Sequence, residues 1–456
     1  MNSVLKFYRD PEMGSIEPRD FKVYNDRNLD RIEALERVSE SMRFDMRVVA
    51  SVLPFRINEY VIDELIDWDN IPDDPMFQLT FPQREMLSPE AFERMAELHR
   101  RGADRKEIAA LAKELRDELN PHPAGQMELN RPSEDDGEVI NGLQHKYRET
   151  VLFFPSQGQT CHSYCTFCFR WAQFVGDKEL RIASTDAGVL HQYLREHPAI
   201  SDLLMTGGDP MVMKTKNLRG YLEALLEPEM EHVQTVRIGT KALSFWPYRF
   251  VTDSDADDLM RLLEQLVEGG KHVALMAHYN HPNELQTPIA REAIRRVRDT
   301  GAEIRAQGPL LRHINDDPQA WADLWREQVR LGIIPYYMFV ERDTGARRYF
   351  EVPLARAWEI YREAMQQVSG LARTARGPSM SADPGKVEIQ GVTEIHGEKV
   401  FVLRFIQGRN PDWVQRPFFA RYDENATWLN QLQPAFGEEK FFFEDEFEAM
   451  KAGQGA

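Results

Sequence analysis

Three cysteines, Cys161, Cys165 and Cys168, lie within eight residues and are the only cysteines among 456 residues. Three thiolates from one loop can hold three corners of a four-iron, four-sulfur (4Fe-4S) cluster and leave the fourth iron open to a substrate or cofactor. Two alternatives are a zinc site with His162 or His313 as fourth ligand, and three buried thiols without a metal. No further cysteine exists, and His162 directly follows Cys161, so that it is badly placed to bind the same metal ion. The spacing therefore favours the cluster.

A pair of glycines follows in the segment Thr206-Gly207-Gly208-Asp209-Pro210. Paired glycines let a backbone approach a ligand closely, and Asp209 has the chemistry to accept a hydrogen bond from an ammonium group. Alone, such a turn is more often a plain connection from a strand to a helix. After the cysteine loop, it favours a ligand-binding turn.

The elements that must position these residues form a repeating pattern. Six short β-branched or aromatic runs are predicted as strands, with starts 30 to 51 residues apart: 151–155, 202–205, 235–239, 272–278, 303–307 and 333–340. Helical patterns separate them, for example at 255–269 and at 288–300, the latter ending before Gly301. The pattern predicts an α/β fold with a parallel, partial or full β/α barrel; an open doubly wound sheet is the alternative. In a barrel, the cysteine loop lies at the carboxyl ends of the strands, where such folds carry their chemistry.

Three regions are expected along the chain. Residues 1–145 form an N-terminal helical region, with a loop at 68–82, a helix that Ser88 opens, and a linker at 120–142 rich in Pro, Gly, Asp and Asn. Residues 146–386 form the barrel. Residues 387–456 form a small β extension, with a helix or arm behind it.

Composition narrows the class of protein. There are 56 Lys and Arg against 74 Asp and Glu, a net charge of −18, which disfavours nucleic acid as a partner. With 42% hydrophobic residues, no run of about 20 apolar residues and no signal-peptide pattern at the start, we expect a cytoplasmic protein with a large core and no membrane contact. Small molecules or proteins are the expected partners, and a homo-oligomer is left open.

The cysteine spacing C-x3-C-x2-C, with Phe167 just before the last cysteine, resembles the radical S-adenosylmethionine (SAM) enzymes. In that superfamily the open iron chelates SAM. An electron from a reductant such as flavodoxin or ferredoxin then cleaves SAM to a 5′-deoxyadenosyl radical. The turn at Gly207, Gly208 and Asp209 resembles the one that binds the methionine amino group of SAM.

Further segments match in order and spacing the lysine 2,3-aminomutase family, over about 46–406: 236–240, 278–284, 307, 310–316 and 335–337. The resemblance implies a radical SAM partial barrel with an N-terminal helical region and a C-terminal extension. It also implies an isomerase that combines the radical with pyridoxal 5′-phosphate (PLP). Such an enzyme binds lysine or a related amino acid as an external aldimine and moves its α-amino group to the β-carbon.

The resemblance also implies roles for single residues. Arg170 matches the arginine that binds the substrate carboxylate; the alternative is a surface arginine. Asp316 matches one of two aspartates that hold the distal ammonium of lysine; the alternative is a helix N-cap. His278 and Gln307 match positions that line the SAM pocket, although a lone histidine there is more often structural.

For PLP, Lys386 is the expected Schiff-base lysine, on a glycine loop that gives it reach. Lys146 and Tyr147 are expected to contact the phosphate and the pyridine ring. The second distal-ammonium aspartate aligns with Ala382 or, after a shift of one residue, with Asp383.

Several positions depart from the family. The glycine run before Lys386 is reduced to Gly385, Thr150 stands where the family has an arginine that Arg148 could replace, and the polar stretch after the tyrosine pair has become 340–342. Three other hypotheses therefore remain open. These are a radical SAM enzyme without PLP acting on another substrate, a non-catalytic metal-binding or scaffold protein, and an enzyme whose substrate is a protein-bound lysine.

Overall fold

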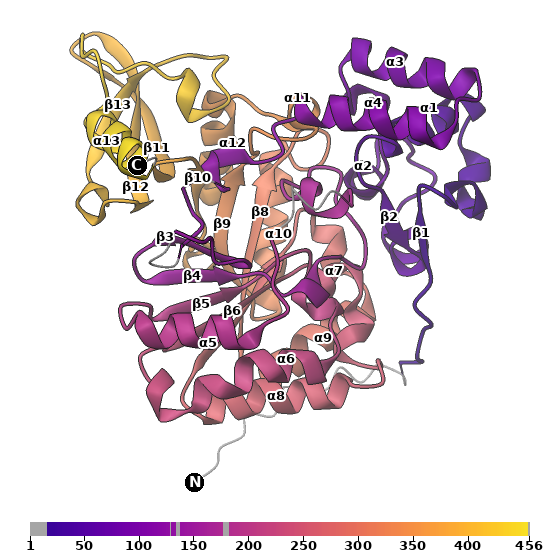
Figure 1. Cartoon of the computed structure of the whole chain (residues 1–456). Helices are drawn as coiled ribbons and strands as arrows, with labels where there is room; N and C mark the ends of the chain where they lie inside the picture. Colours follow the sequence, from indigo (N-terminus) through magenta and orange to yellow (C-terminus); the bar gives the residue numbers. More distant parts are fainter. Residues whose placement is uncertain (1–15, 128, 134–136, 177–181, 455–456) are drawn as a thin grey trace.

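The computed structural model describes residues 16–127, 129–133, 137–176 and 182–454 (Figure 1). Its centre is an 11-stranded sheet with the order β13-β12-β11-β10-β9-β8-β7-β6-β5-β4-β3. Strands β4 to β10 are parallel to one another. They are β4 (Thr150–Phe153), β5 (Asp202–Met205), β6 (Thr235–Thr240), β7 (His272–His278), β8 (Glu303–Leu310), β9 (Ile334–Val340) and β10 (Arg376–Ser381).

The six predicted strands are confirmed as β4 to β9, with ends that shift by at most three residues. Each strand pairs with the next one in the chain, so the strand order never reverses. A doubly wound sheet requires such a reversal, and that alternative is therefore wrong. No pairing between β3 and β13 occurs in the described part of the chain, so the sheet is a partial barrel.

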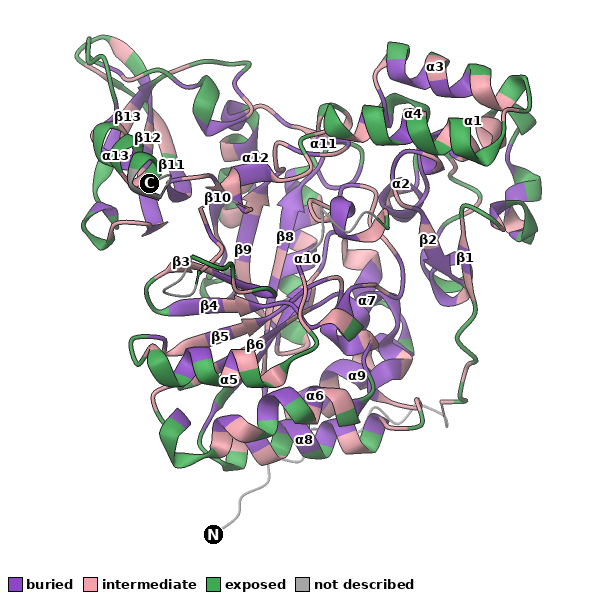
Figure 2. Ribbon diagram, viewed as in Figure 1, coloured by how far each residue is buried: buried purple, intermediate pink, exposed green. Residues whose placement is uncertain are grey.

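Helices cover the outside of the parallel strands, with buried residues toward the sheet and exposed residues outward (Figure 2). They are α5 (Ala187–Glu196), α6 (Thr215–Leu222), α8 (Ala256–Glu268), α9 (Pro288–Asp299), α10 (Pro318–Arg330) and α12 (Leu354–Gln366). Two short helices, α7 (Ala242–Phe245) and α11 (Arg347–Phe350), instead contribute Phe245 and Phe350 to the core of the N-terminal region. In α9, the Thr287 side chain caps the first turn and Gly301, at φ +85°, follows its end, as predicted. None of the described helices has the length and apolar character needed to cross a bilayer.

The N-terminal region is not purely helical. It contains α1 (Glu40–Ala50), α2 (Pro75–Thr80), α3 (Pro89–Arg100) and α4 (Arg105–Asp117), and an antiparallel pair of β1 (Val23–Asn25) with β2 (Arg56–Asn58). Ser88 caps α3 as predicted. The loop expected at 68–82 instead contains α2, because Asp74 caps a helix that Pro75 begins. Parts of the predicted linker, residues 128 and 134–136, lie outside the described residues.

Antiparallel strands extend both ends of the sheet. At one end β3 (Leu143–Tyr147) pairs with β4; at the other, β11 (Gly385–Ile395), β12 (Glu398–Gly408) and β13 (Pro417–Arg421) follow β10, with α13 (Glu444–Gln454) behind them. The Nζ of Lys146 in β3 donates to the carbonyl of Ala382, in the turn between β10 and β11, at 2.6 Å. The sheet therefore curls until β3 approaches the turn between β10 and β11, and we call this contact the seam.

Candidate functional site

The cysteine loop follows β4 and lies against the N-terminal region. The backbone N–H of Tyr164 donates to the carbonyl of Arg56 in β2, and that of Thr166 donates to the carbonyl of Leu79 in α2. Phe167 packs in the hydrophobic core of the N-terminal region. This region therefore holds the loop in place, a role that its helical sequence pattern did not reveal.

The three thiols lie close enough together to influence one another electrostatically. Burial raises the pKa of each thiol above its usual value, to about 11 for Cys168. At each thiol one cation opposes this shift. The pairs are Cys161 with Arg56, Cys165 with Lys241, and Cys168 with Arg170. Thiolates bound to iron carry negative charge, and these three cations fit that charge.

Among the described residues, no group of three or more His, Cys, Asp or Glu side chains converges as the ligands of a single metal ion do. A 4Fe-4S cluster takes one thiolate per iron, so its ligands lie farther apart than those of one zinc ion. The His162 ring packs edge-on against Phe21 and parallel to Trp246, and the His313 ring stacks on Tyr349. The arrangement fits a cluster and disfavours the zinc alternative.

The glycine turn packs directly on the start of the cysteine loop. A Cβ on Gly208 would lie 2.6 Å from the backbone nitrogen of Thr160, and Gly207 has φ +151°, which other residues rarely adopt. The backbone N–H of Asp209 donates to the carbonyls of Gly158 (3.0 Å) and Thr160 (2.7 Å). Close contact between the two segments therefore explains both glycines.

The Asp209 carboxylate is buried and fully engaged within the protein. It accepts hydrogen bonds from the Thr240 hydroxyl (2.7 Å) and from the backbone N–H groups of Lys241 (2.8 Å) and Met211 (2.9 Å). Burial raises the pKa of Asp209 to about 6, although these hydrogen bonds oppose the shift. An ammonium group would have to compete with these donors, so the carboxylate is placed to hold the turn together.

Arg170 bridges the cysteine loop and the glycine turn. Its guanidinium donates to the Thr206 hydroxyl and to the Gly207 carbonyl (3.0 Å), and it lies 4.9 Å and 5.0 Å from the ring centroids of Phe154 and Phe169. Burial lowers the pKa of Arg170 to about 10. The surface-arginine alternative is therefore wrong.

The two residues predicted to line the SAM pocket are neighbours. His278 at the end of β7 is in register with Gln307 of β8. The His278 ring lies edge-on to Phe167 of the cysteine loop, with centroids 5.5 Å apart, and burial lowers the pKa of His278 well below its usual value. The structure thus places a neutral imidazole beside the cysteine loop.

Lys386 is expected on a glycine loop, but it is the second residue of β11 and is in register with Ser381. Its ammonium lies 4.8 Å from the ring centroid of Tyr337 and 5.9 Å from that of Phe339. It makes no hydrogen bond or ion pair within the part of the chain that the structure describes. Burial, followed by the charge of Arg237, lowers the pKa of Lys386 to about 7. A lysine with this pKa is partly neutral at pH 7 and therefore nucleophilic.

More cations surround Lys386 than carboxylates. Lys146 is close by, and burial lowers its pKa well below the usual value. The charge of Arg342 lowers the pKa of Lys386 and of Arg170, so it lies within electrostatic reach of both. Tyr147 lies within electrostatic reach of Arg342 as well. A nucleophilic lysine, an aromatic ring and excess positive charge suit PLP, which carries an aldehyde, a pyridine ring and a phosphate.

Of the two aspartates expected at the distal ammonium, Asp383 lies within electrostatic reach of Lys146 and Arg342, which surround Lys386. Asp316 is exposed in the loop after β8, and its neighbour Asp317 caps α10 by accepting from Ala320, so Asp316 is not an N-cap either. Asp383 lies in the turn between β10 and β11 with its side chain 37% exposed, and an oxygen lies 3.9 Å from Nζ of Lys451. No contact among the described residues joins Asp316 to Arg170 or Lys386.

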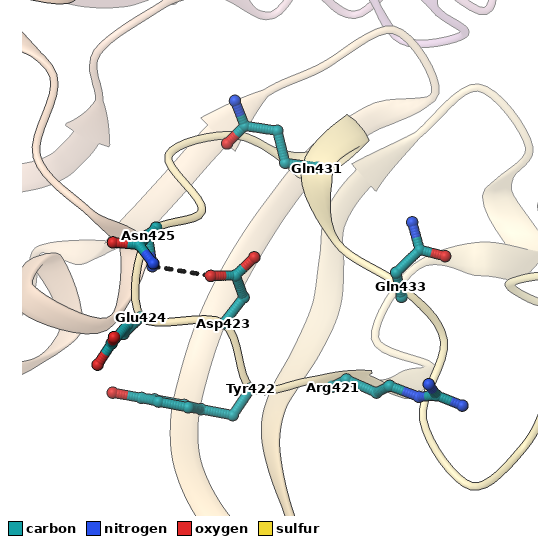
Figure 3. A pocket seen from close by; sticks show the side chains of 7 residues that line it. All are labelled: Arg421, Tyr422, Asp423, Glu424, Asn425, Gln431 and Gln433. Atoms are coloured by element: carbon teal, nitrogen blue, oxygen red, sulfur yellow. Dashed lines mark hydrogen bonds between the residues drawn. The ribbon is translucent and has the colours of Figure 1, made fainter.

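A hollow of about 480 Å³ lies on the C-terminal extension, away from the cysteines (Figure 3). The residues that line it are Arg421, Tyr422, Asp423, Glu424, Asn425, Gln431 and Gln433. Arg421 and Glu424 point in opposite directions, and the Asp423 carboxylate already accepts from the backbone of Asn425 at 2.8 Å. The side chains do not converge on a common ligand position.

Comparison with known proteins agrees with the geometry. A protein of Aquifex aeolicus that is named as a candidate L-lysine 2,3-aminomutase is 31% identical to this chain over 410 residues. The match covers 90% of this chain and 96% of that protein. L-lysine 2,3-aminomutase of Escherichia coli is 28% identical over 262 residues, 57% of this chain and 71% of that enzyme. A solved radical SAM methyltransferase from Sphaerobacter thermophilus is 14% identical, covers 61% of this chain and 91% of that chain, and superposes with a TM-score of only 0.35. No protein-family model matches the sequence. By the similarity that extends over nearly its whole length, this chain belongs to the lysine 2,3-aminomutase family.

Proposed function

We propose that this protein is a PLP-dependent radical SAM aminomutase that moves the α-amino group of lysine or a related amino acid to the β-carbon. The observation that carries the proposal is Lys386. The Lys386 amine has a pKa of about 7 and lies on the ring of Tyr337. Arg342 lies within electrostatic reach of Lys386 and also of Arg170, which is beside the cysteines.

Two bound groups would supply the chemistry: a 4Fe-4S cluster with SAM to generate a carbon radical, and PLP to delocalise electrons from the substrate. Cys161, Cys165 and Cys168 would hold three irons, and the turn at Gly207 and Gly208 would lie beside SAM. A one-electron reductant such as flavodoxin or ferredoxin would start the reaction.

Arg170 would orient the substrate. The Nη1 atom of its guanidinium donates hydrogen bonds to Thr206 and Gly207 of the glycine turn. The Nε and Nη2 atoms make no hydrogen bond with the described residues. These two donors form a planar edge that suits bidentate binding of the α-carboxylate. An amino acid held there would lie beside the cysteine loop.

The rings of Tyr337 and Phe339 would exclude water from Lys386. They stack on each other with centroids 4.8 Å apart and lie beneath the Lys386 ammonium. Low water content keeps the amine neutral and protects a reactive radical from side reactions.

The proposal predicts that wild-type protein supplied with PLP develops the visible absorbance of lysine-bound PLP, which borohydride bleaches. Lys386→Ala should lose the band. Lys399→Ala is a matched control, because this lysine also lies on an aromatic ring, 3.5 Å from the Tyr422 centroid, but in β12. A band absent from wild type would favour the radical SAM enzyme without PLP, and a band retained by Lys386→Ala would exclude Lys386 as the attachment point.

The pH dependence of this band is a further prediction. Only the neutral amine attacks an aldehyde, and Lys386 loses its proton near pH 7 and not near pH 10. The rate of PLP attachment should therefore rise from pH 6 and level off above pH 8, with a midpoint near 7. A rate that still climbs about tenfold per pH unit at pH 9 would show that the amine has an ordinary pKa.

A further inference from the structure

The sequence lacks one arginine that the family uses near PLP, and Thr150 takes its place. The Thr150 hydroxyl donates to Asp202 at 2.9 Å, and Asp202 is paired with Arg237 through a second hydrogen bond of 2.8 Å. Arg148, the replacement suggested by the sequence, is exposed in the turn between β3 and β4. The structure therefore leaves open which cation serves the cofactor's phosphate.

Arg376 lies on the same aromatic ring as Lys386. It is the first residue of β10 and is in register with Tyr337 of β9. Its guanidinium is 4.2 Å from the Tyr337 centroid and 4.4 Å from that of Tyr336, and the Lys386 ammonium is 4.8 Å from the Tyr337 centroid. In the described part of the chain, Arg376 makes no hydrogen bond and no ion pair. A half-buried guanidinium without an acceptor is an incomplete arrangement that an anion would complete.

The other arginines near Lys386 are less suited. Arg237 is paired with Asp202. Arg409 already donates hydrogen bonds to the carbonyls of Asp383 and Leu129 and to the side chain of Asn130. The Arg342 side chain makes no hydrogen bond or ion pair with the described residues, but its guanidinium lies 5.0 Å from the centroid of Phe169. Arg170, the expected carboxylate-binding residue, contacts the same ring.

We propose that Arg376 binds the phosphate group of PLP and so replaces the arginine that is missing at Thr150. This inference rests on the proposed function, since it requires PLP on Lys386. A phosphate monoester carries nearly two negative charges at pH 7 and three acceptor oxygens. A guanidinium is the side chain best matched to it, through two parallel hydrogen bonds.

Binding of PLP and of pyridoxal, which lacks only the phosphate, provides the test. Absorbance titration of the iron-free protein measures both affinities without any turnover. Arg376→Gln should weaken PLP binding by about 10- to 100-fold and change pyridoxal binding by less than twofold, because only the charge-assisted contacts to phosphate are lost. Arg376→Lys, which keeps the charge but not the planar fork, should give a smaller loss for PLP alone.

Arg305→Gln is the matched control. Arg305 also lies on Tyr336, 5.4 Å from the centroid, but it is paired with Glu303. This variant should bind both ligands as wild type does. Unchanged PLP binding in Arg376→Gln, or equal losses for PLP and pyridoxal, would overturn the assignment; if that variant does not fold, Arg376→Lys decides by the same criterion. Wild type that binds neither ligand would instead remove PLP from the proposed function, and this inference with it.

Discussion

Replacing Cys165 with alanine should reduce SAM cleavage to background. Only three cysteines exist in the chain, so no other thiol can take the vacant place on the cluster. A cluster with two protein ligands is expected to lose iron or to bind SAM wrongly, and either outcome ends formation of the radical. Anaerobic, reduced wild-type protein should convert SAM to 5′-deoxyadenosine, and Cys165→Ala should not.

His162→Gln is the control for this experiment. The His162 ring packs against Phe21 and Trp246, and burial lowers the pKa of His162 to about 3. If the cysteines hold a 4Fe-4S cluster, this variant should keep its iron and its SAM cleavage. Zinc in place of iron, lost upon His162→Gln, would support the zinc alternative. Absence of SAM cleavage in iron-loaded wild type would support the non-catalytic hypothesis.

Gly208→Ala should have the second-largest effect. An added Cβ would lie 2.6 Å from the backbone nitrogen of Thr160, which cannot move without moving Cys161. Overpacking of this kind costs about 1–3 kcal/mol of folding free energy. Because the strain falls on a ligand of the cluster, we expect iron content and 5′-deoxyadenosine formation to fall much further than stability.

Gly220→Ala is the matched control for that substitution. Gly220 is exposed in α6, and nothing lies within 4 Å of an added Cβ. Alanine there should raise the free energy of unfolding by up to about 1 kcal/mol, since glycine is unfavourable in a helix. Denaturant unfolding with iron analysis measures both variants. Gly208→Ala with normal iron content would contradict the close packing of turn and loop.

The parallel strands could be predicted from sequence because each is a short apolar run bounded by turn residues. Strand β7 is buried over Val273–Ala277, as a parallel strand covered on both faces must be. Strand β10 escaped prediction because Gly377 and Pro378 lie within it, and these residues normally argue against a strand. Its register with β9 is irregular between Arg376 and Ser379, which accommodates them. Helix α2 is not predicted, because Asp and Pro are as typical of a loop as of a helix start.

The residues of the site divide in the same way. The cysteines, the glycine turn and Arg170 belong to short local patterns, so sequence alone was enough to single them out. Arg56, Lys241 and Arg376 come from three different elements and approach the site only through folding. No spacing in the chain marks them, because their roles follow from contacts that β2, the turn after β6 and β10 make with the rest of the barrel.

The seam has a consequence for how this protein acquires its shape. Among the described residues, side-chain hydrogen bonds and no strand ladder close the seam. Lys146 of β3 binds Ala382 in the turn between β10 and β11, and Arg409 after β12 binds Leu129 and Asn130 in the segment before β3. Each such bond contributes about 1 kcal/mol net, much less than a cooperative run of paired strands. PLP attached to Lys386 on β11 and in contact with Tyr147 on β3 would bind to both sides of the seam. In the proposed function, binding of PLP would therefore stabilise the contact between β3 and β11, so that cofactor affinity and the stability of the closed barrel would depend on each other.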